Sequence, residues 1–241
     1  MHLRVQLAIL VASALVALAS WQLLLKVNPI VPVPEELFGL TQPNTEQVAQ
    51  LRAHHRLNIS YALAIYGALA MLAGLPAIVG QSASTGQRPL LKRLIGFVVV
   101  AVLAGGGCGL LISWIGHYGE DWLPITLDPL VRVSTRLLVS LLPFALAASL
   151  LAVLFTSNLK QFPGSFLGGL LGALLASFAF ALVAGLAFQN ENSDVVLPPG
   201  TSCQLLLFFF VPWLIWATIV YQLRGASALA HQPAEHALEP I

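Results

Sequence analysis

Residues 164 to 188 read GSFLGGLLGALLASFAFALVAGLAF, an apolar run long enough to cross the ~30 Å hydrocarbon core of a membrane. Five other runs share this character, and none of the six contains Lys, Arg, Asp, Glu or His. Lipid offers no hydrogen-bond partner to the backbone, and these runs do not alternate as barrel strands do, so we expect helices. We predict spans at Val5–Leu25, Ile59–Gly80, Leu94–Gly116, Leu137–Thr156, Gly164–Phe188 and Cys203–Gln222.

Composition indicates the same class of protein. Hydrophobic residues make up 58% of the chain and charged residues only 9%, whereas about a quarter of the residues of a soluble domain are charged. The longest polar segment, 26–58, is too short to form an independent folded core. We therefore predict one all-α integral membrane domain over residues 1–241, a bundle of six transmembrane helices with a mobile tail at 225–241.

The first span has a second interpretation. Arg4, the apolar run after it and Ala17-Leu18-Ala19 before Ser20 match the three parts of a secretory signal peptide, and cleavage there would leave five spans. The apolar run continues to Leu25, however, which is long enough to span a membrane. We therefore favour an uncleaved anchor.

Lys and Arg near the span ends predict the orientation, because cytoplasmic loops carry an excess of both. Arg88, Lys92 and Arg93 crowd one short loop, and placing it in the cytoplasm puts both termini there as well. The cytoplasmic side then holds six cations, which are Arg4, Arg88, Lys92, Arg93, Lys160 and Arg224. The outer side holds five, which are Lys26, Arg52, Arg56, Arg132 and Arg136. We expect the membrane to be a plasma (inner) membrane.

The outer segment 26–58 divides into two parts. Its beginning contains Pro29, Pro32 and Pro34, which favour an extended path. From Asn44 to Gln47 the residue types are those of a capping box, so we predict a helix that begins near Asn44 and continues into the second span.

Small residues recur inside the spans. Gly164, Gly168, Gly172 and Ala176 fall four apart, a spacing that lets two helix backbones approach closely in lipid. The face they form either packs within the chain or docks another copy or another subunit. Glycines 105, 106, 107 and 109 mark a kink or a second close approach, and we expect kinks at Pro143 and Pro212.

Polar residues at the outer span ends are the best candidates for chemistry. His54, His55, His117, Glu120 and Asp121 have the side chains that bind a divalent metal, although solvated helix ends explain them better. Arg132 and Arg136 lie one turn apart and suit a lipid phosphate or another anion, or serve as anchors that reach the interface. We predict no bound cofactor or metal.

Two short motifs resemble intramembrane proteases. His54 to Asn58 is similar to the HxxxN element of rhomboid proteases, and Glu35-Glu36 is similar to the glutamate pair of CAAX-type membrane proteases. The rhomboid Gly-x-Ser-Gly context is absent, no later span contains His, and Leu40 stands where the second motif requires Arg. No predicted span contains a His that could bind a haem iron. The net charge is +1 and the chain has no basic stripe, so nothing supports nucleic-acid binding.

We therefore expect a non-enzymatic accessory, scaffolding or assembly subunit that packs with membrane lipids, other membrane subunits or a second copy of itself. One alternative is a transporter or channel for a neutral or apolar solute, which needs no charge in the membrane, with hydroxyls such as Ser13, Ser149 and Thr218 along its path. A second alternative is an enzyme that acts at the outer membrane surface.

Overall fold

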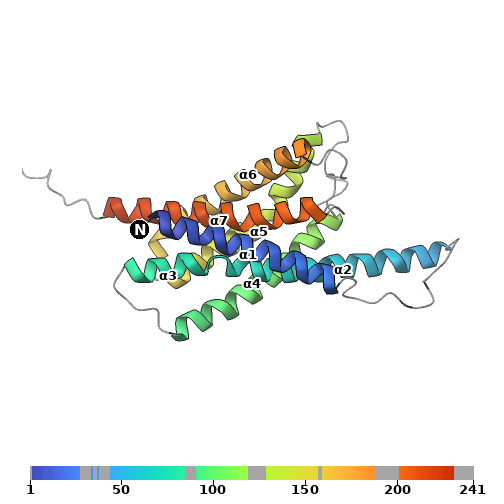
Figure 1. Cartoon of the computed structure of the whole chain (residues 1–241), viewed down its shortest axis with the longest axis horizontal. Coiled ribbons are helices and arrows are strands. Elements are labelled where there is room, and N and C mark those ends of the chain that lie inside the picture. Colours follow the sequence, from blue (N-terminus) through green and yellow to red (C-terminus); the bar gives the residue numbers. More distant parts are fainter. Residues whose placement is uncertain are drawn as a thin grey trace, which may run out of the picture.

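The computed structural model is built from helices alone across the residues it describes, which are 2–27, 34, 37, 44–84, 91–118, 129–156, 159–187 and 201–230 (Figure 1). The seven α-helices and one short 3-10 helix are α1 His2–Val27, α2 Thr45–Leu72, α3 Leu75–Ser84, α4 Leu91–Tyr118, α5 Pro129–Thr156, η2 Leu159–Gln161, α6 Phe162–Ala187 and α7 Thr201–Ala230.

Six helical stretches are long and apolar enough to cross a membrane. They cover Leu3–Leu23, Thr45–Gly80, Leu91–Ile115, Leu130–Phe155, Leu159–Ala187 and Ser202–Leu223. Each stretch overlaps one predicted span, and the stretch from Thr45 begins well before the predicted start at Ile59, so the prediction of six apolar helices is confirmed. Residue 188, the predicted end of the fifth span, lies outside the described residues, as do segment 28–33 and the tail from 231 onward.

The six spans form a closed ring of neighbours. Each long helix packs against the next one along the chain: α2 against α4, α4 against α5, α5 against α6, and α6 against α7. The ring closes because α1 packs against α7 and, through smaller contacts, against α2 and α3. The first and last helices of the chain are therefore side by side (Figure 1).

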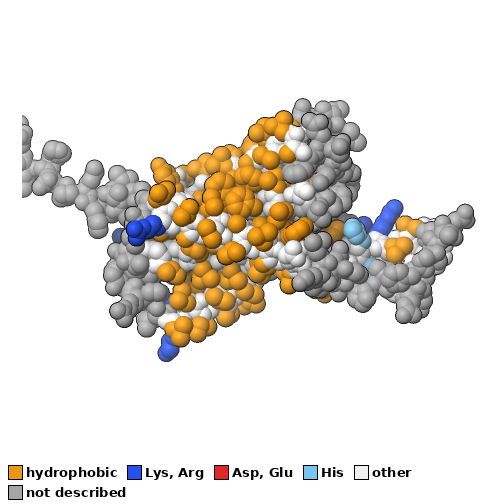
Figure 2. All heavy atoms as spheres, viewed as in Figure 1, with side chains coloured by type: hydrophobic (Ala, Val, Ile, Leu, Met, Phe, Trp, Pro, Cys, Tyr) orange, Lys and Arg blue, Asp and Glu red, His pale blue; other side chains and the backbone are white. Residues whose placement is uncertain are grey.

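Apolar side chains cover the middle of the bundle. On the face drawn in Figure 2, hydrophobic side chains occupy the centre and the described Lys and Arg lie at the two ends. Large exposed side chains include Leu7 and Leu15 on α1, Leu103 on α4 and Leu186 on α6. Exposed leucines on α1, α4 and α6 are expected where the solvent is lipid rather than water.

The N-terminal part of α2 extends beyond the bundle (Figure 1). Its capping box is formed as predicted: the Asn44 side-chain oxygen accepts the Gln47 N–H at 2.8 Å, and the Gln47 side-chain oxygen accepts the Asn44 N–H at 3.0 Å. The fourteen residues from Thr45 to Asn58 precede the predicted span and measure about 20 Å at 1.5 Å per residue. We call these residues the α2 extension.

Candidate functional site

The closest approach of two backbones lies between α2 and α4. A Cβ atom added at Gly105 would collide with the carbonyl of Gly67, and one at Gly109 would collide with the carbonyl of Leu63. Gly107 of the same run has open space around it. Gly105 and Gly109 therefore serve a close approach to α2, within a helix that continues from Leu91 to Tyr118.

The predicted small-residue face of α6 lies against α7. An added Cβ at Gly168 would lie 2.7 Å from the Thr218 carbonyl oxygen, and one at Gly172 would lie 2.5 Å from the Cα of Ile215. Ala176 is completely buried, and an added Cβ at Gly164 would meet only the Gln222 carbonyl oxygen, at 3.9 Å. Three of these four positions thus face neighbours within the chain at close range, which leaves little of this face for a partner.

Two serines join α5 to α6 on the other side of that helix. The Ser149 hydroxyl donates to the Ser165 carbonyl at 3.0 Å, and the Ser165 hydroxyl donates to the Ser149 carbonyl at 3.2 Å. Ser149 also contacts its own helix through the Ala145 carbonyl at 2.7 Å. Both side chains are completely buried, so these hydrogen bonds satisfy hydroxyls that lipid would leave unpaired.

The second span is broken, which the sequence analysis did not predict. Helix α2 ends at Leu72 and α3 begins at Leu75, with Gly74 N–H donating to the Met71 carbonyl at 3.1 Å. Pro76 has no N–H to donate to the Leu72 carbonyl, and its ring disfavours a regular helix there. Gly74 lies directly on the Trp216 ring, where any Cβ would collide. Gly74 and Pro76 within an apolar run were the sequence signal that could have predicted this break.

Three buried hydroxyls have no hydrogen-bond partner among the described residues. They belong to Ser13 and Ser20 on α1 and to Tyr66 on α2. The Tyr66 ring stacks on Phe208 of α7, with ring centroids 4.2 Å apart. About two and a half turns away along α7, the Ala217 carbonyl accepts the Gln6 side-chain N–H of α1 at 3.2 Å.

The polar candidates at the span ends are only partly described. His54 is half-buried and His55 is exposed, both on the α2 extension. The His117 backbone lies near the end of α4, but its side chain, Glu120 and Asp121 fall outside the described residues. Within the described ranges no group of three or more His, Cys, Asp or Glu is placed to hold a metal ion.

Arg132 and Arg136 lie one turn apart near the start of α5, and both side chains are half-buried. Ser134 and Thr135 between them donate to carbonyls of their own helix, Leu130 and Val131, at 2.7 Å each. Both arginines lie near the start of α5, at the end of the bundle from which the α2 extension projects, and their binding of a lipid phosphate or another anion stays a prediction.

Comparison with protein-family models, with curated proteins and with solved structures finds no match. The class of protein therefore rests on the fold itself. Six helices of this length and apolarity define a multi-pass integral membrane protein.

Proposed function

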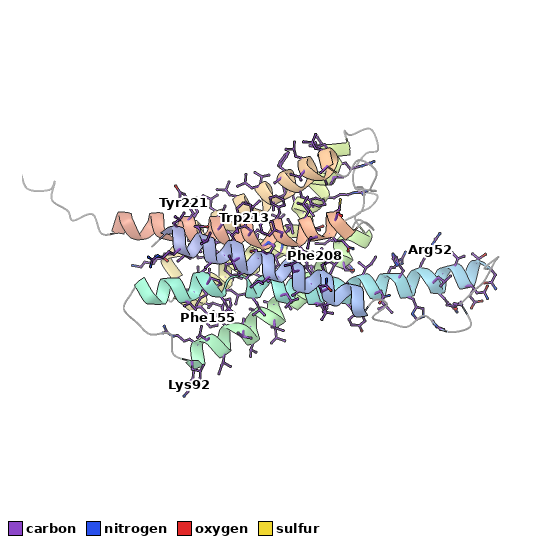
Figure 3. All side chains as sticks on the ribbon, viewed as in Figure 1. Arg52, Lys92, Phe155, Phe208, Trp213 and Tyr221 are labelled. Carbon is purple, nitrogen blue, oxygen red and sulfur yellow. The ribbon has the colours of Figure 1, made fainter. Side chains whose placement is uncertain are left out.

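We propose that this chain is a non-enzymatic scaffolding or assembly subunit that binds other membrane proteins through the α2 extension. The extension carries the proposal because it continues about 20 Å past the predicted span as a capped helix. Its exposed side chains include Arg52, His55 and Arg56, with Arg52 labelled in Figure 3. A partner with acidic side chains is complementary to this surface.

Packing inside the bundle supports a structural role over transport. Of the hydroxyls that a solute path would use, Ser113 is paired with Ser60 at 2.7 Å, and Ser149 is paired with Ser165. Thr218 donates to the Leu214 carbonyl of its own helix at 2.7 Å, and Ser177 donates to the Leu174 carbonyl at 2.8 Å. These four hydroxyls therefore have no free proton to donate to a passing solute, whereas Ser13 on α1 has no partner among the described residues.

The same proposal includes an orientation. Arg4, Lys92, Arg93 and Lys160 lie at the end of the bundle opposite the α2 extension (Figure 3 labels Lys92). With the cation-rich loop between α3 and α4 in the cytoplasm, both termini are cytoplasmic and the α2 extension is on the outer face. The partner then binds the α2 extension on the outer face of a plasma (inner) membrane.

Purification in mild detergent followed by native mass spectrometry tests the proposal. We expect a stoichiometric partner or a second copy with the wild-type protein, and loss of that species when Arg52→Glu and Arg56→Glu are combined. Lys92→Glu, at the opposite end, is the matched control and should retain the partner. A lone monomer in the wild-type sample, or equal retention by all three proteins, would contradict the proposal.

A further inference from the structure

Four exposed cations lie at the end of the bundle opposite the α2 extension, and we call them the cation patch. They are Arg4 on α1, Lys92 and Arg93 in the first turn of α4, and Lys160 in η2. None of the helices that carry them contains Asp or Glu. Among the residues that the structure describes, the one acid is Glu46, which lies on the α2 extension at the opposite end. No carboxylate of a described helix therefore balances the charge of the patch.

Packing between α4 and α5 brings the cations of α4 and of η2 to the same end of neighbouring elements. The Phe155 ring near the end of α5 meets the Phe97 ring edge-on, with centroids 5.2 Å apart. A Cβ atom added at Gly96 would lie 3.7 Å from the Phe155 ring. Lys92 is one turn before Gly96, and Lys160 follows Phe155 in η2, which packs on α5 and α6. Both cations therefore lie just beyond this aromatic contact (Figure 3 labels Lys92 and Phe155).

An exposed apolar ridge begins next to the α4 cations. Its members fall four residues apart along one side of the helix, and we call them the α4 ridge. They are Leu91, Ile95, Val99 and Leu103, with exposed fractions of 71%, 55%, 52% and 71%. The ridge is about 18 Å long, comparable to one half of the ~30 Å hydrocarbon core. On the face drawn in Figure 2, the Lys and Arg at this end likewise border hydrophobic surface, which places them at the boundary between hydrocarbon and headgroups.

This arrangement matches a molecule with an anionic head and an apolar tail. Arg binds phosphate oxygens in a bidentate geometry, and Lys binds them as a point charge. Basic residues directly next to a membrane span attract anionic lipid headgroups. An acidic protein in water would use the charge of the patch but not the α4 ridge, whereas a phospholipid uses both. The ridge therefore favours a lipid over a soluble partner.

We propose that the cation patch and the α4 ridge together bind an anionic phospholipid. Lys92 and Arg93 hold its phosphate, Arg4 and Lys160 add to the positive potential at this end of the bundle, and an acyl chain lies along the α4 ridge. This site goes beyond the scaffolding role and does not depend on it, because it uses no residue of the α2 extension.

Dioleoyl phosphatidylglycerol and dioleoyl phosphatidylcholine are matched probes, because they share both acyl chains and differ in the net charge of the headgroup. The purified full chain in a neutral detergent is titrated with each lipid, and native mass spectrometry measures the bound fraction. We expect phosphatidylglycerol to bind roughly tenfold more tightly or better. Neither glycerophosphoglycerol, which is the same headgroup without acyl chains, nor a polyglutamate peptide at equal concentration should displace it.

Lys92→Gln combined with Arg93→Gln removes two charges from exposed side chains, and circular dichroism checks that the helices are retained. We expect the affinity for phosphatidylglycerol to fall about 30-fold, roughly fivefold per cation, with the affinity for phosphatidylcholine unchanged. Lys92→Arg combined with Arg93→Lys keeps both charges and should retain the wild-type affinity. Arg52→Gln combined with Arg56→Gln, on the α2 extension beyond the bundle, is the matched control and should also retain it.

Four outcomes would overturn the proposal. The first is equal affinity of the wild type for the two lipids, and the second is an equal loss of affinity in the two Gln pairs. The third is a loss in the charge-keeping pair as large as in the Gln pair at the same positions. The fourth is displacement of the lipid by glycerophosphoglycerol or by polyglutamate, which would assign the patch to a soluble phosphate or to an acidic protein.

Discussion

The indole N–H of Trp216 donates a 3.2 Å hydrogen bond to the carbonyl oxygen of Ala70, which links α7 to α2 at the point where the second span breaks. In a continuous helix that carbonyl would accept the Gly74 N–H, but Gly74 donates to Met71 instead. An unpaired carbonyl in lipid costs several kcal/mol, so the tryptophan stabilises a break that the surroundings would otherwise oppose.

Removing this donor should destabilise the fold. Trp216→Phe leaves the Ala70 carbonyl unpaired, and we expect the free energy of unfolding to fall by about 1–3 kcal/mol. Titration with a denaturing detergent, followed by circular dichroism, measures the change. Trp213→Phe removes the same N–H from a half-buried ring that stacks on Phe209, 5.5 Å away between centroids, and provides the control. Equal losses of unfolding free energy for both variants would mean that the hydrogen bond from Trp216 to Ala70 does not contribute to stability.

The packing of α2 against α4 predicts opposite effects on stability when two neighbouring glycines are replaced by alanine. Gly105→Ala forces its Cβ into the Gly67 carbonyl, and we expect a loss of about 1–3 kcal/mol as the helices separate. Gly107→Ala meets open space and should be neutral or stabilising by up to about 1 kcal/mol, because alanine restricts the unfolded chain. Thermal unfolding in detergent distinguishes the two variants, and similar midpoints for both would rule out this crossing.

Each hydroxyl of the serine pair between α5 and α6 should stabilise the fold separately, because each donates to the other residue's backbone carbonyl, which remains after substitution by alanine. Ser149→Ala and Ser165→Ala should each lower the free energy of unfolding by about 0.5–1.5 kcal/mol, and the double variant should lose nearly the sum of the two. Titration with a denaturing detergent, followed by circular dichroism, measures the losses. Ser134→Ala is the control and should lose less, since the Ser134 hydroxyl contacts only its own helix among the bonds described. Losses no larger than that of the control would show that these two hydrogen bonds do not stabilise the contact between α5 and α6.

The proposed orientation predicts which sites an impermeant maleimide reaches in intact cells. Arg52→Cys, on the exposed α2 extension, should be labelled directly, whereas Lys92→Cys at the opposite end should need permeabilised cells. The wild type gives the background, because Cys108 is half-buried and Cys203 is buried. The reverse pattern would invert the topology and place the α2 extension in the cytoplasm.

Apolar length was enough to predict the spans, because lipid penalises any charged residue and any irregular backbone at that depth. The Asn44 capping box was predictable for a similar reason, since its hydrogen bonds join residues three apart. Contacts between residues that are distant in sequence could not be predicted in this way. The spacing of Gly168 and Gly172 indicated a close contact without naming α7, and nothing local links Ser149 to Ser165 or Trp216 to Ala70.

The hydrogen bond between Gln6 and Ala217 joins residues 211 positions apart, which has a consequence for synthesis. At roughly 5–20 residues per second, a ribosome takes about 10–40 s to reach the second partner after making the first. Throughout that time the glutamine amide and the part of the first helix that packs on α7 lack their final partner. An insertion factor or another membrane helix must shelter them, so a nascent chain halted before its last span is expected to be recognised as unfinished and degraded.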